Sequence, residues 1–223
     1  KKVIVEKNGV IEWVTGSFGS RISMLYPMSI LNGENAKTEF TVGLTIPDVQ
    51  NYVPGSFDKG SYPMIGVTEN VKEVVIETKN IISSVQFDIT GEKAISKIEL
   101  FSEDLALAGA AQVVAAYGQN PVVSVNGETA VNKVVLLCGD GVQLGQEPVE
   151  FHIAFAPCAG SLSVNIYDTE GGYVTKNLPV REYQRNERVR YTTNYVPERS
   201  VVDDLKTAFE KGGEYKLPVD VTV

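Results

Sequence analysis

Apolar and polar side chains alternate along most of this chain. Between Phe40 and Ile46 every second residue is apolar, until Pro47 ends the run. The same period of two runs through residues 85–89 and 162–166. Each run places one apolar face inward and one polar face outward, which is typical of half-buried antiparallel strands.

Turn sequences separate these runs at short intervals. They are Asn8-Gly9, Asn32-Gly33, Thr90-Gly91-Glu92, Asn126-Gly127, Pro157-Cys158-Ala159-Gly160 and Asp168-Thr169-Glu170-Gly171-Gly172. Many short strands joined by such turns predict an all-β fold, an antiparallel β-sandwich, rather than an α/β fold. We expect its core to contain Phe87, Ile89, Phe151, Ile153, Leu162, Val164 and Ile166. Residues 106–117 are rich in alanine, but Gly109 and the Val113-Val114 pair favour an irregular strand there.

One helix is predicted, close to the C-terminus. Ser200 can cap it, Asp203 follows three residues later, and Gly212-Gly213 ends it. Val202, Leu205 and Phe209 share one face of this helix. We expect that face to pack on a final strand at residues 215–223.

Three parts of the chain follow from this pattern. Residues 1–67 form an N-terminal β region, residues 68–196 form the β-sandwich, and residues 197–223 form a linker, helix and strand. Because the last strand pattern stops with the chain, we expect this final part to open a further, truncated domain.

Charge and hydropathy argue against several classes of partner and location. There are 28 acidic and 20 basic residues, which gives a net charge of −8 and an isoelectric point near 4.8. A deficit of lysine and arginine argues against nucleic acid as a partner and against binding to an anionic membrane. No apolar run approaches the ~20 residues of a transmembrane helix. Residues 1–6 lack the apolar segment of a signal peptide, so the protein is either cytosolic or exported after removal of a signal segment not present in this chain.

No residue pattern predicts a catalytic, cofactor or metal site. Gly139, Gly141 and Gly145 follow an apolar strand, but the third glycine comes one position late for a dinucleotide-binding fingerprint and Pro148 leads into another strand. We interpret this stretch as a glycine-rich strand connection. His152 is the only histidine, and its position in the alternation predicts a solvent-facing side chain.

The cysteines and acidic residues allow structural interpretations. Cys138 and Cys158 have no metal-ligand spacing, and their order alone leaves open whether they form a disulfide. Asp203-Asp204 suits the first turn of the helix, where negative charge is favourable. Asp168 and Glu170 could be calcium ligands, but a hairpin tip is the simpler interpretation.

A basic and aromatic segment follows. It contains Arg181, Tyr183, Arg185, Arg188, Arg190 and Tyr191. Such a mixture can bind a polyanion, yet Glu182 and Glu187 favour an exposed strand with cross-strand ion pairs. Trp13 could stack on a sugar, although a single aromatic residue in a strand more often packs in a core or at an edge.

A series of short patterns runs through residues 22–195. They occur at 24–29, 45–50, 55–58, 62–65, 95–100, 107–109, 134–144, 151–157, 162–172 and at Arg185-Asn186. In this order they resemble the fimbrillin-like surface proteins of Bacteroides-type bacteria. The resemblance implies a β-sandwich of transthyretin-like topology, export to the outer-membrane surface as a lipoprotein, and a role in fimbriae or cell adhesion. The family's lipobox cysteine and much of its first domain are absent here. Residues 200–223 resemble instead the opening helix and first coil of a right-handed parallel β-helix.

We therefore weigh three functions. The first is a non-enzymatic structural or adhesive module whose partners are other surface or fimbrial proteins or a host or matrix ligand. The second is a glycan-binding β-sandwich. The third is an anchor or spacer domain for a surface polysaccharide-degrading β-helix enzyme.

Overall fold

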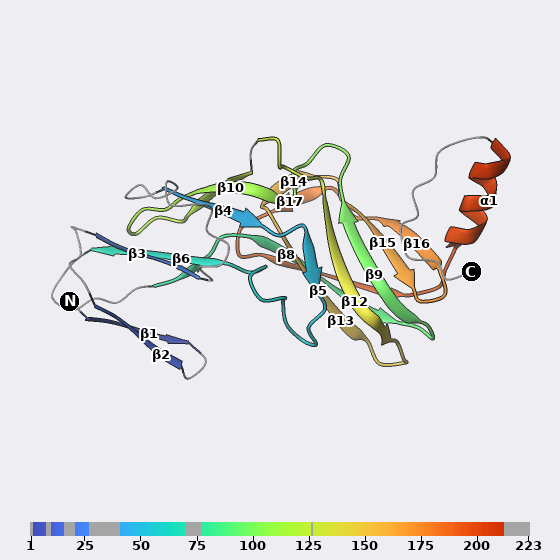
Figure 1. Cartoon of the computed structure of the whole chain (residues 1–223), viewed down its shortest axis with the longest axis horizontal. Coiled ribbons are helices and arrows are strands. Elements are labelled where there is room, and N and C mark those ends of the chain that lie inside the picture. Colours follow the sequence, from blue (N-terminus) through green and yellow to red (C-terminus); the bar gives the residue numbers. More distant parts are fainter. Residues whose placement is uncertain are drawn as a thin grey trace.

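The computed structural model describes residues 2–7, 10–15, 21–26, 41–69, 77–125 and 127–211. Within these residues the structure is mostly strand and turn, with one helix near their C-terminal end (Figure 1). The strands are β1 (Lys2–Lys7), β2 (Val10–Thr15), β3 (Arg21–Tyr26), β4 (Thr41–Ile46), β5 (Val49–Asn51), β6 (Met64–Glu69), β7 (Lys79–Asn80), β8 (Ser83–Thr90), β9 (Ala94–Phe101), β10 (Gly109–Val114), β11 (Val122–Val125), β12 (Lys133–Gln143), β13 (Val149–Phe155), β14 (Cys158–Gly160), β15 (Ser163–Asp168), β16 (Gly172–Asn177), β17 (Arg181–Tyr183), β18 (Arg188–Asn194) and β19 (Arg199–Ser200), and the helix is α1 (Val201–Lys211).

Two sheets form the sandwich. One has six strands in the order β19-β16-β15-β9-β12-β5, and the other has three in the order β13-β8-β18. Most pairings are antiparallel, while β12 with β5 and β18 with β8 run parallel. Buried apolar residues from both sheets, such as Phe87 and Ile98, belong to one hydrophobic cluster. The predicted all-β sandwich is therefore confirmed.

The alternating runs supply that core. Phe87, Ile89, Phe151, Ile153, Leu162, Val164 and Ile166 are all at most 1% exposed. Aromatic pairs fill the space between the strands: Phe87 stacks on Tyr191, and Phe155 meets Tyr183 edge to face. Burying side chains of this size is worth about 1.5–3 kcal/mol each, so these runs are a main source of stability.

Further strands extend the molecule beyond the sandwich. In Figure 1, β4 and β10 lie toward the upper left of the sandwich, β3 and β6 lie at its left, and α1 lies at the opposite end. The order in the first group is β11-β10-β4, and in the second it is β3-β6-β7. Strand β10 covers residues 109–114, so the strand expected in the alanine-rich segment is confirmed. Leu44 and Ile46 of β4 belong to the same hydrophobic cluster as the sandwich. The division of the chain into 1–67, 68–196 and 197–223 stays a prediction.

The glycine run lies within β12. The pairing of β12 with β9 shifts register between Leu137 and Val142, which is a β-bulge. Gly141 has φ +110°, and a Cβ there would lie 2.6 Å from Cγ2 of Thr169. The backbone conformation and this close approach both require glycine. Here the glycines bend a strand.

Helix α1 begins directly after β19. Asp203 and Asp204 lie in its first turn and Lys211 in its last, as the sequence predicts. Val201 is fully buried and forms a small cluster with Tyr167 and Tyr173. The side chain of Phe209 is 79% exposed. The glycine stop and the strand expected at 215–223 lie outside the described residues, as do the turns at Asn8-Gly9 and Asn32-Gly33. No helix in the described part of the chain is long and apolar enough to span a membrane.

Candidate functional site

His152 is buried, so the prediction of a solvent-facing histidine is wrong. It lies on β13 opposite Gln86 of β8, and the residue is 4% exposed. It does point away from Phe151 and Ile153, as alternation requires. That second face of the strand is nevertheless covered, because the ring of Phe57 lies 5.1 Å from the imidazole.

The cover over His152 comes from a distant part of the chain. Phe57 stacks on Tyr62 at a centroid distance of 4.2 Å, and the guanidinium of Arg188 lies 5.7 Å from the Phe57 ring. Tyr52 packs on the opposite face of β13, against the core residue Phe151, with ring centroids 5.1 Å apart. Phe57, in the loop between β5 and β6, therefore shields His152 on the outer face of the three-stranded sheet.

Charged groups surround the imidazole. Nε2 of His152 lies 3.4 Å from Oε2 of Glu150, and Arg190 pairs with the buried carboxylate of Asp88. Neither ring nitrogen makes a hydrogen bond to another described residue. Burial lowers the pKa of His152 below its usual range, and Arg188 lowers it further, against the opposing effect of Glu150 and Asp88. For Asp88, burial acts to raise the pKa, but hydrogen bonds from Arg190 and Gln86 outweigh it and leave the pKa lowered. The imidazole is therefore neutral in this environment at neutral pH.

Both cysteines carry thiols that do not form a disulfide. Cys138 lies buried on β12, and Cys158 lies half-buried on β14. Burial raises the pKa of Cys138 to about 12 and that of Cys158 to about 11. Since the thiolate is the reactive form, neither group is a good nucleophile near neutral pH.

Asp168 organises the hairpin between β15 and β16. Its Oδ1 accepts hydrogen bonds from the backbone N–H groups of Glu170 (2.9 Å) and Gly172 (2.8 Å). Its Oδ2 accepts a hydrogen bond of 3.0 Å from the hydroxyl of Tyr195. Glu170 pairs with Lys93 at 2.6 Å. Within the described residues no group of three or more His, Cys, Asp or Glu side chains could hold a metal ion. The hairpin interpretation of Asp168 and Glu170 thus has a structural basis.

The basic segment is largely paired. Arg181 pairs with Glu187, and Arg190 pairs with Asp88. The hydroxyls of Tyr183 and Tyr191 lie 3.1 Å apart. The structure therefore favours the strand with cross-strand ion pairs over a polyanion site. The side chain of Trp13 lies outside the described residues.

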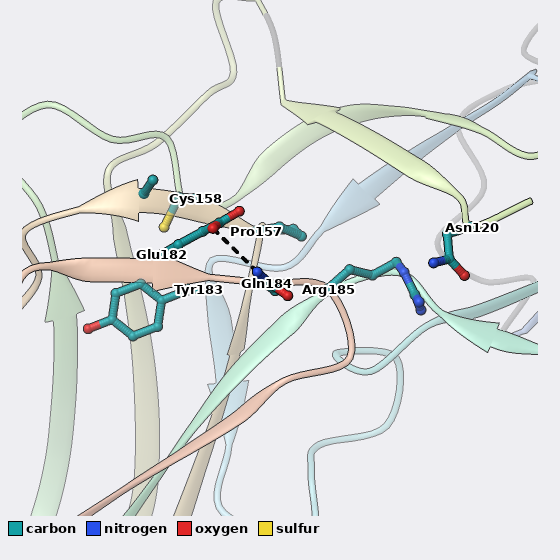
Figure 2. A pocket seen from close by; sticks show the side chains of 8 residues that line it. Asn120, Pro157, Cys158, Glu182, Tyr183, Gln184 and Arg185 are labelled. Atoms are coloured by element: carbon teal, nitrogen blue, oxygen red, sulfur yellow. Dashed lines mark hydrogen bonds between the residues drawn. The ribbon is translucent and has the colours of Figure 1, made fainter.

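An open polar hollow lies where β14 and β17 meet (Figure 2). Its volume is about 500 Å³, and its lining includes Asn120, Glu182, Gln184 and Arg185. Figure 2 shows Arg185 reaching toward Asn120, while Gln184 donates a hydrogen bond of 3.3 Å to Glu182. Side-chain amides, a carboxylate and a guanidinium thus face one open space.

The two residues of β7 form hydrogen bonds with polar groups of the hollow and of the adjacent turn. The ammonium of Lys79 donates to Gln119 O (3.1 Å) and to Asn120 Oδ1 (3.3 Å). Arg185 donates to the backbone carbonyl of Asn80. Tyr117, three residues before Asn120, is 54% exposed and lines a neighbouring hollow together with Lys79. We call Lys79, Tyr117, Asn120, Gln184 and Arg185 the tip surface.

A second polar cluster, on β9, was not predicted from the sequence. Lys97 and Glu99 of β9 are 8% and 7% exposed, and Lys97 Nζ lies 3.0 Å from Glu99 Oε1. Both belong to the polar positions of an alternating run, where exposure is expected. The sequence did contain a signal for this ion pair: two opposite charges at positions i and i+2 of one strand lie on the same face and can meet.

Comparisons with known proteins identify similar folds but assign the chain to no family. No family model matches the chain. It is 43% identical over 37 residues to the iron–sulfur cluster assembly protein SufB of Bacillus subtilis, and 49% identical over 37 residues to a SufBD family protein of Staphylococcus saprophyticus. These matches cover 17% of this chain and 8% of either relative, so the chain spans only a small part of their length.

Two solved structures share the fold. A candidate cell adhesion protein from Bacteroides ovatus superposes with a TM-score of 0.55 at 14% identity, over 85% of this chain and 71% of the other. A second, from Bacteroides uniformis, gives 0.52 at 11% identity, over 81% of this chain and 68% of the other. At these identities the likeness concerns architecture. The chain thus has the β-rich fold of two candidate cell adhesion proteins from Bacteroides.

Proposed function

We propose that this chain is a non-enzymatic adhesive or structural module of a bacterial cell-surface protein, located extracellularly or at the outer-membrane surface. The observation that carries this proposal is the fold shared with the Bacteroides ovatus protein over 85% of the chain. Fold likeness alone does not assign a function. The chemistry of the described residues adds support, because both thiols have raised pKa values and the histidine is buried.

The tip surface is the contact region that we propose for a host, matrix or surface-protein ligand. Tyr117 offers a large, half-exposed ring, and such residues often dominate binding energy at interfaces. Asn120 and Arg185 are already oriented by Lys79 and Asn80, so little side-chain freedom is lost when a ligand binds. An exposed anchor beside preorganised polar groups suits specific adhesion.

A glycan is the second candidate ligand. The hollow in Figure 2 combines hydrogen-bond donors of Asn120, Gln184 and Arg185 with the carboxylate acceptor of Glu182. Sugar hydroxyls both donate and accept hydrogen bonds, so this mixture fits them. The exposed ring of Tyr117 lies in the turn next to these groups.

Binding of the purified chain to immobilised matrix proteins, mucin and a glycan array tests both candidates. We expect saturable binding that falls at least tenfold in the Tyr117→Ala, Arg185→Ala double variant. Lys176→Ala removes an exposed positive charge on β16 and serves as the matched control that should bind normally. Equal binding by both variants would refute the proposal that the tip surface contacts the ligand. Turnover of an ester, glycoside or peptide by the native chain would refute the non-enzymatic role.

A further inference from the structure

An amine, a carboxylate and a carboxamide lie together on neighbouring strands of the six-stranded sheet. Lys97 and Glu99 belong to β9, and Asn165 belongs to β15. In the antiparallel pairing, Asn165 lies opposite Glu99 and Tyr167 lies opposite Lys97. Lys97 and Asn165 are therefore diagonal neighbours on one face, a separation that long side chains can span.

Glu99 contacts both potential reactants. Its Oε1 lies 3.0 Å from Nζ of Lys97, and its Oε2 lies 3.5 Å from Nδ2 of Asn165. The hydroxyl of Tyr167 donates to the same Oε2 over 3.2 Å. One carboxylate thus bridges an amine and an amide nitrogen.

The carbonyl of the same amide has its own donor. The hydroxyl of Thr175, on β16, donates to Oδ1 of Asn165 over 2.7 Å. A donor at this position stabilises negative charge that develops on the oxygen when a nucleophile attacks the carbon. Asn165 is therefore polarised at Oδ1 and held at Nδ2.

Aromatic rings exclude water from the amine. Lys97 Nζ lies 4.4 Å from the centroid of the Tyr167 ring, which stacks on Tyr173 at 5.2 Å. Burial acts to raise the pKa of Glu99, but Lys97 and Lys133 outweigh it and hold the pKa below its usual value. Glu99 is the group to which Lys97 can pass its proton, because Oε1 of Glu99 lies 3.0 Å from Nζ of Lys97.

We propose that Lys97 and Asn165 form an intramolecular amide cross-link, with Glu99 as the acid–base group. Lys97 passes a proton to Glu99, and the neutral Nζ then attacks Cγ of Asn165. The C=O electron pair moves to Oδ1, where the Thr175 hydroxyl stabilises it.

Collapse of this intermediate releases ammonia. Glu99 returns its proton to Nδ2, the Cγ–Nδ2 bond breaks, and the C=O bond forms again. The remaining extra proton on Nζ leaves with the ammonia as ammonium. One C–N bond replaces another, so the step needs no oxidant, no reductant and no second substrate.

The cross-link joins β9 covalently to β15 in the middle of the six-stranded sheet. A covalent tie between distant residues restricts the unfolded chain and so favours the folded state, as a disulfide does. This chemistry is independent of any ligand at the tip surface. The inference therefore stands or falls separately from the proposed adhesive role.

Mass spectrometry of the intact chain tests the inference directly. We expect the purified native chain, after prolonged incubation, to weigh one ammonia less than its sequence. Proteolysis should then yield one branched peptide that contains both Lys97 and Asn165. A chain of full mass, or ammonia loss from a single unbranched peptide, would overturn the proposal without any variant.

Variants identify the roles. Lys97→Arg, Asn165→Ala and Glu99→Gln should each have the full mass, with circular dichroism used to show that they are folded. Lys133 is the matched control, because its Nζ lies 3.5 Å from the same Glu99 oxygen. Lys133→Arg should still lose ammonia. A cross-link that persists in Lys97→Arg and disappears in Lys133→Arg would contradict the assignment.

Discussion

The side-chain amide of Gln50 hydrogen-bonds both backbone groups of Ala154, 104 residues away in the sequence. Nε2 donates to the carbonyl of Ala154 over 2.6 Å, and the N–H of Ala154 donates to Oε1 over 3.1 Å. Gln50 is 0% exposed. It belongs to β5, at the edge of the six-stranded sheet, whereas Ala154 belongs to β13, at the edge of the three-stranded sheet. One primary amide therefore joins the edges of the two sheets.

Gln50→Ala should destabilise the protein strongly. It would leave the N–H and the carbonyl of Ala154 without the amide partner, and each unsatisfied buried group costs about 1–3 kcal/mol. We expect a loss of about 2–4 kcal/mol in the free energy of unfolding, measured by urea denaturation. Gln112→Ala, at an exposed position on β10, is the control and should change stability by less than about 0.5 kcal/mol. Equal effects of the two substitutions would show that the bridge contributes little.

His152 should make stability depend on pH. Its pKa is lowered in the folded state, so the unfolded chain binds a proton more readily. Stability is therefore complete above the unfolded pKa of about 6.5 and is lost as the pH falls below it, by at most about 1.4 kcal/mol per pH unit. Denaturation at pH 8, 7, 6 and 5 measures this slope.

The variant His152→Leu isolates that effect. The sequence contains no other histidine, so the dependence between pH 7 and 5 should largely disappear. Stability at pH 8 should change little, because an apolar side chain replaces a neutral, buried imidazole of similar size. An unchanged slope in the variant would assign the pH dependence to carboxylates.

Asp168 should contribute stability through hydrogen bonds. Asp168→Ala removes the acceptor for the N–H groups of Glu170 and Gly172 and for the hydroxyl of Tyr195. We expect a loss of about 2–4 kcal/mol, and a smaller loss for Asp168→Asn, which keeps one acceptor oxygen. A chelator should leave the melting temperature of the native chain unchanged. A fall in melting temperature that added calcium reverses would instead identify Asp168 and Glu170 as metal ligands.

The two thiols should resist alkylation in the folded protein. With pKa values of about 12 and about 11, Cys138 and Cys158 hold little thiolate at pH 8. We expect iodoacetamide to modify both at least about 100-fold more slowly than in urea-unfolded chain, as followed by mass spectrometry. Cys158 is half-buried and Cys138 is buried, so Cys158 should react first. Rapid labelling of Cys138 under native conditions would contradict the burial.

Local patterns predicted the strands, the core and the helix. Phe87, Ile89, Phe151 and Ile153 are buried as expected because the side-chain direction in a strand alternates whatever the strand packs against. The α1 helix follows from its capping residue and its acidic first turn. No local sequence pattern predicted the tip surface. Lys79, Tyr117 and Arg185 come from three separate segments, and only the fold brings those segments together.

The sequence by itself determined which face of each strand is apolar, and the tertiary structure decided which polar faces are covered. His152 is buried because Phe57, from the loop between β5 and β6, lies over it. Lys97 and Glu99 are buried because Tyr167 of β15 lies beside them. Strand alternation depends on neighbours along the backbone, whereas burial of a polar face depends on segments that meet only after folding. For that reason period-two alternation identified the core, and only the tertiary structure showed that Asn165 lies beside Lys97 and Glu99.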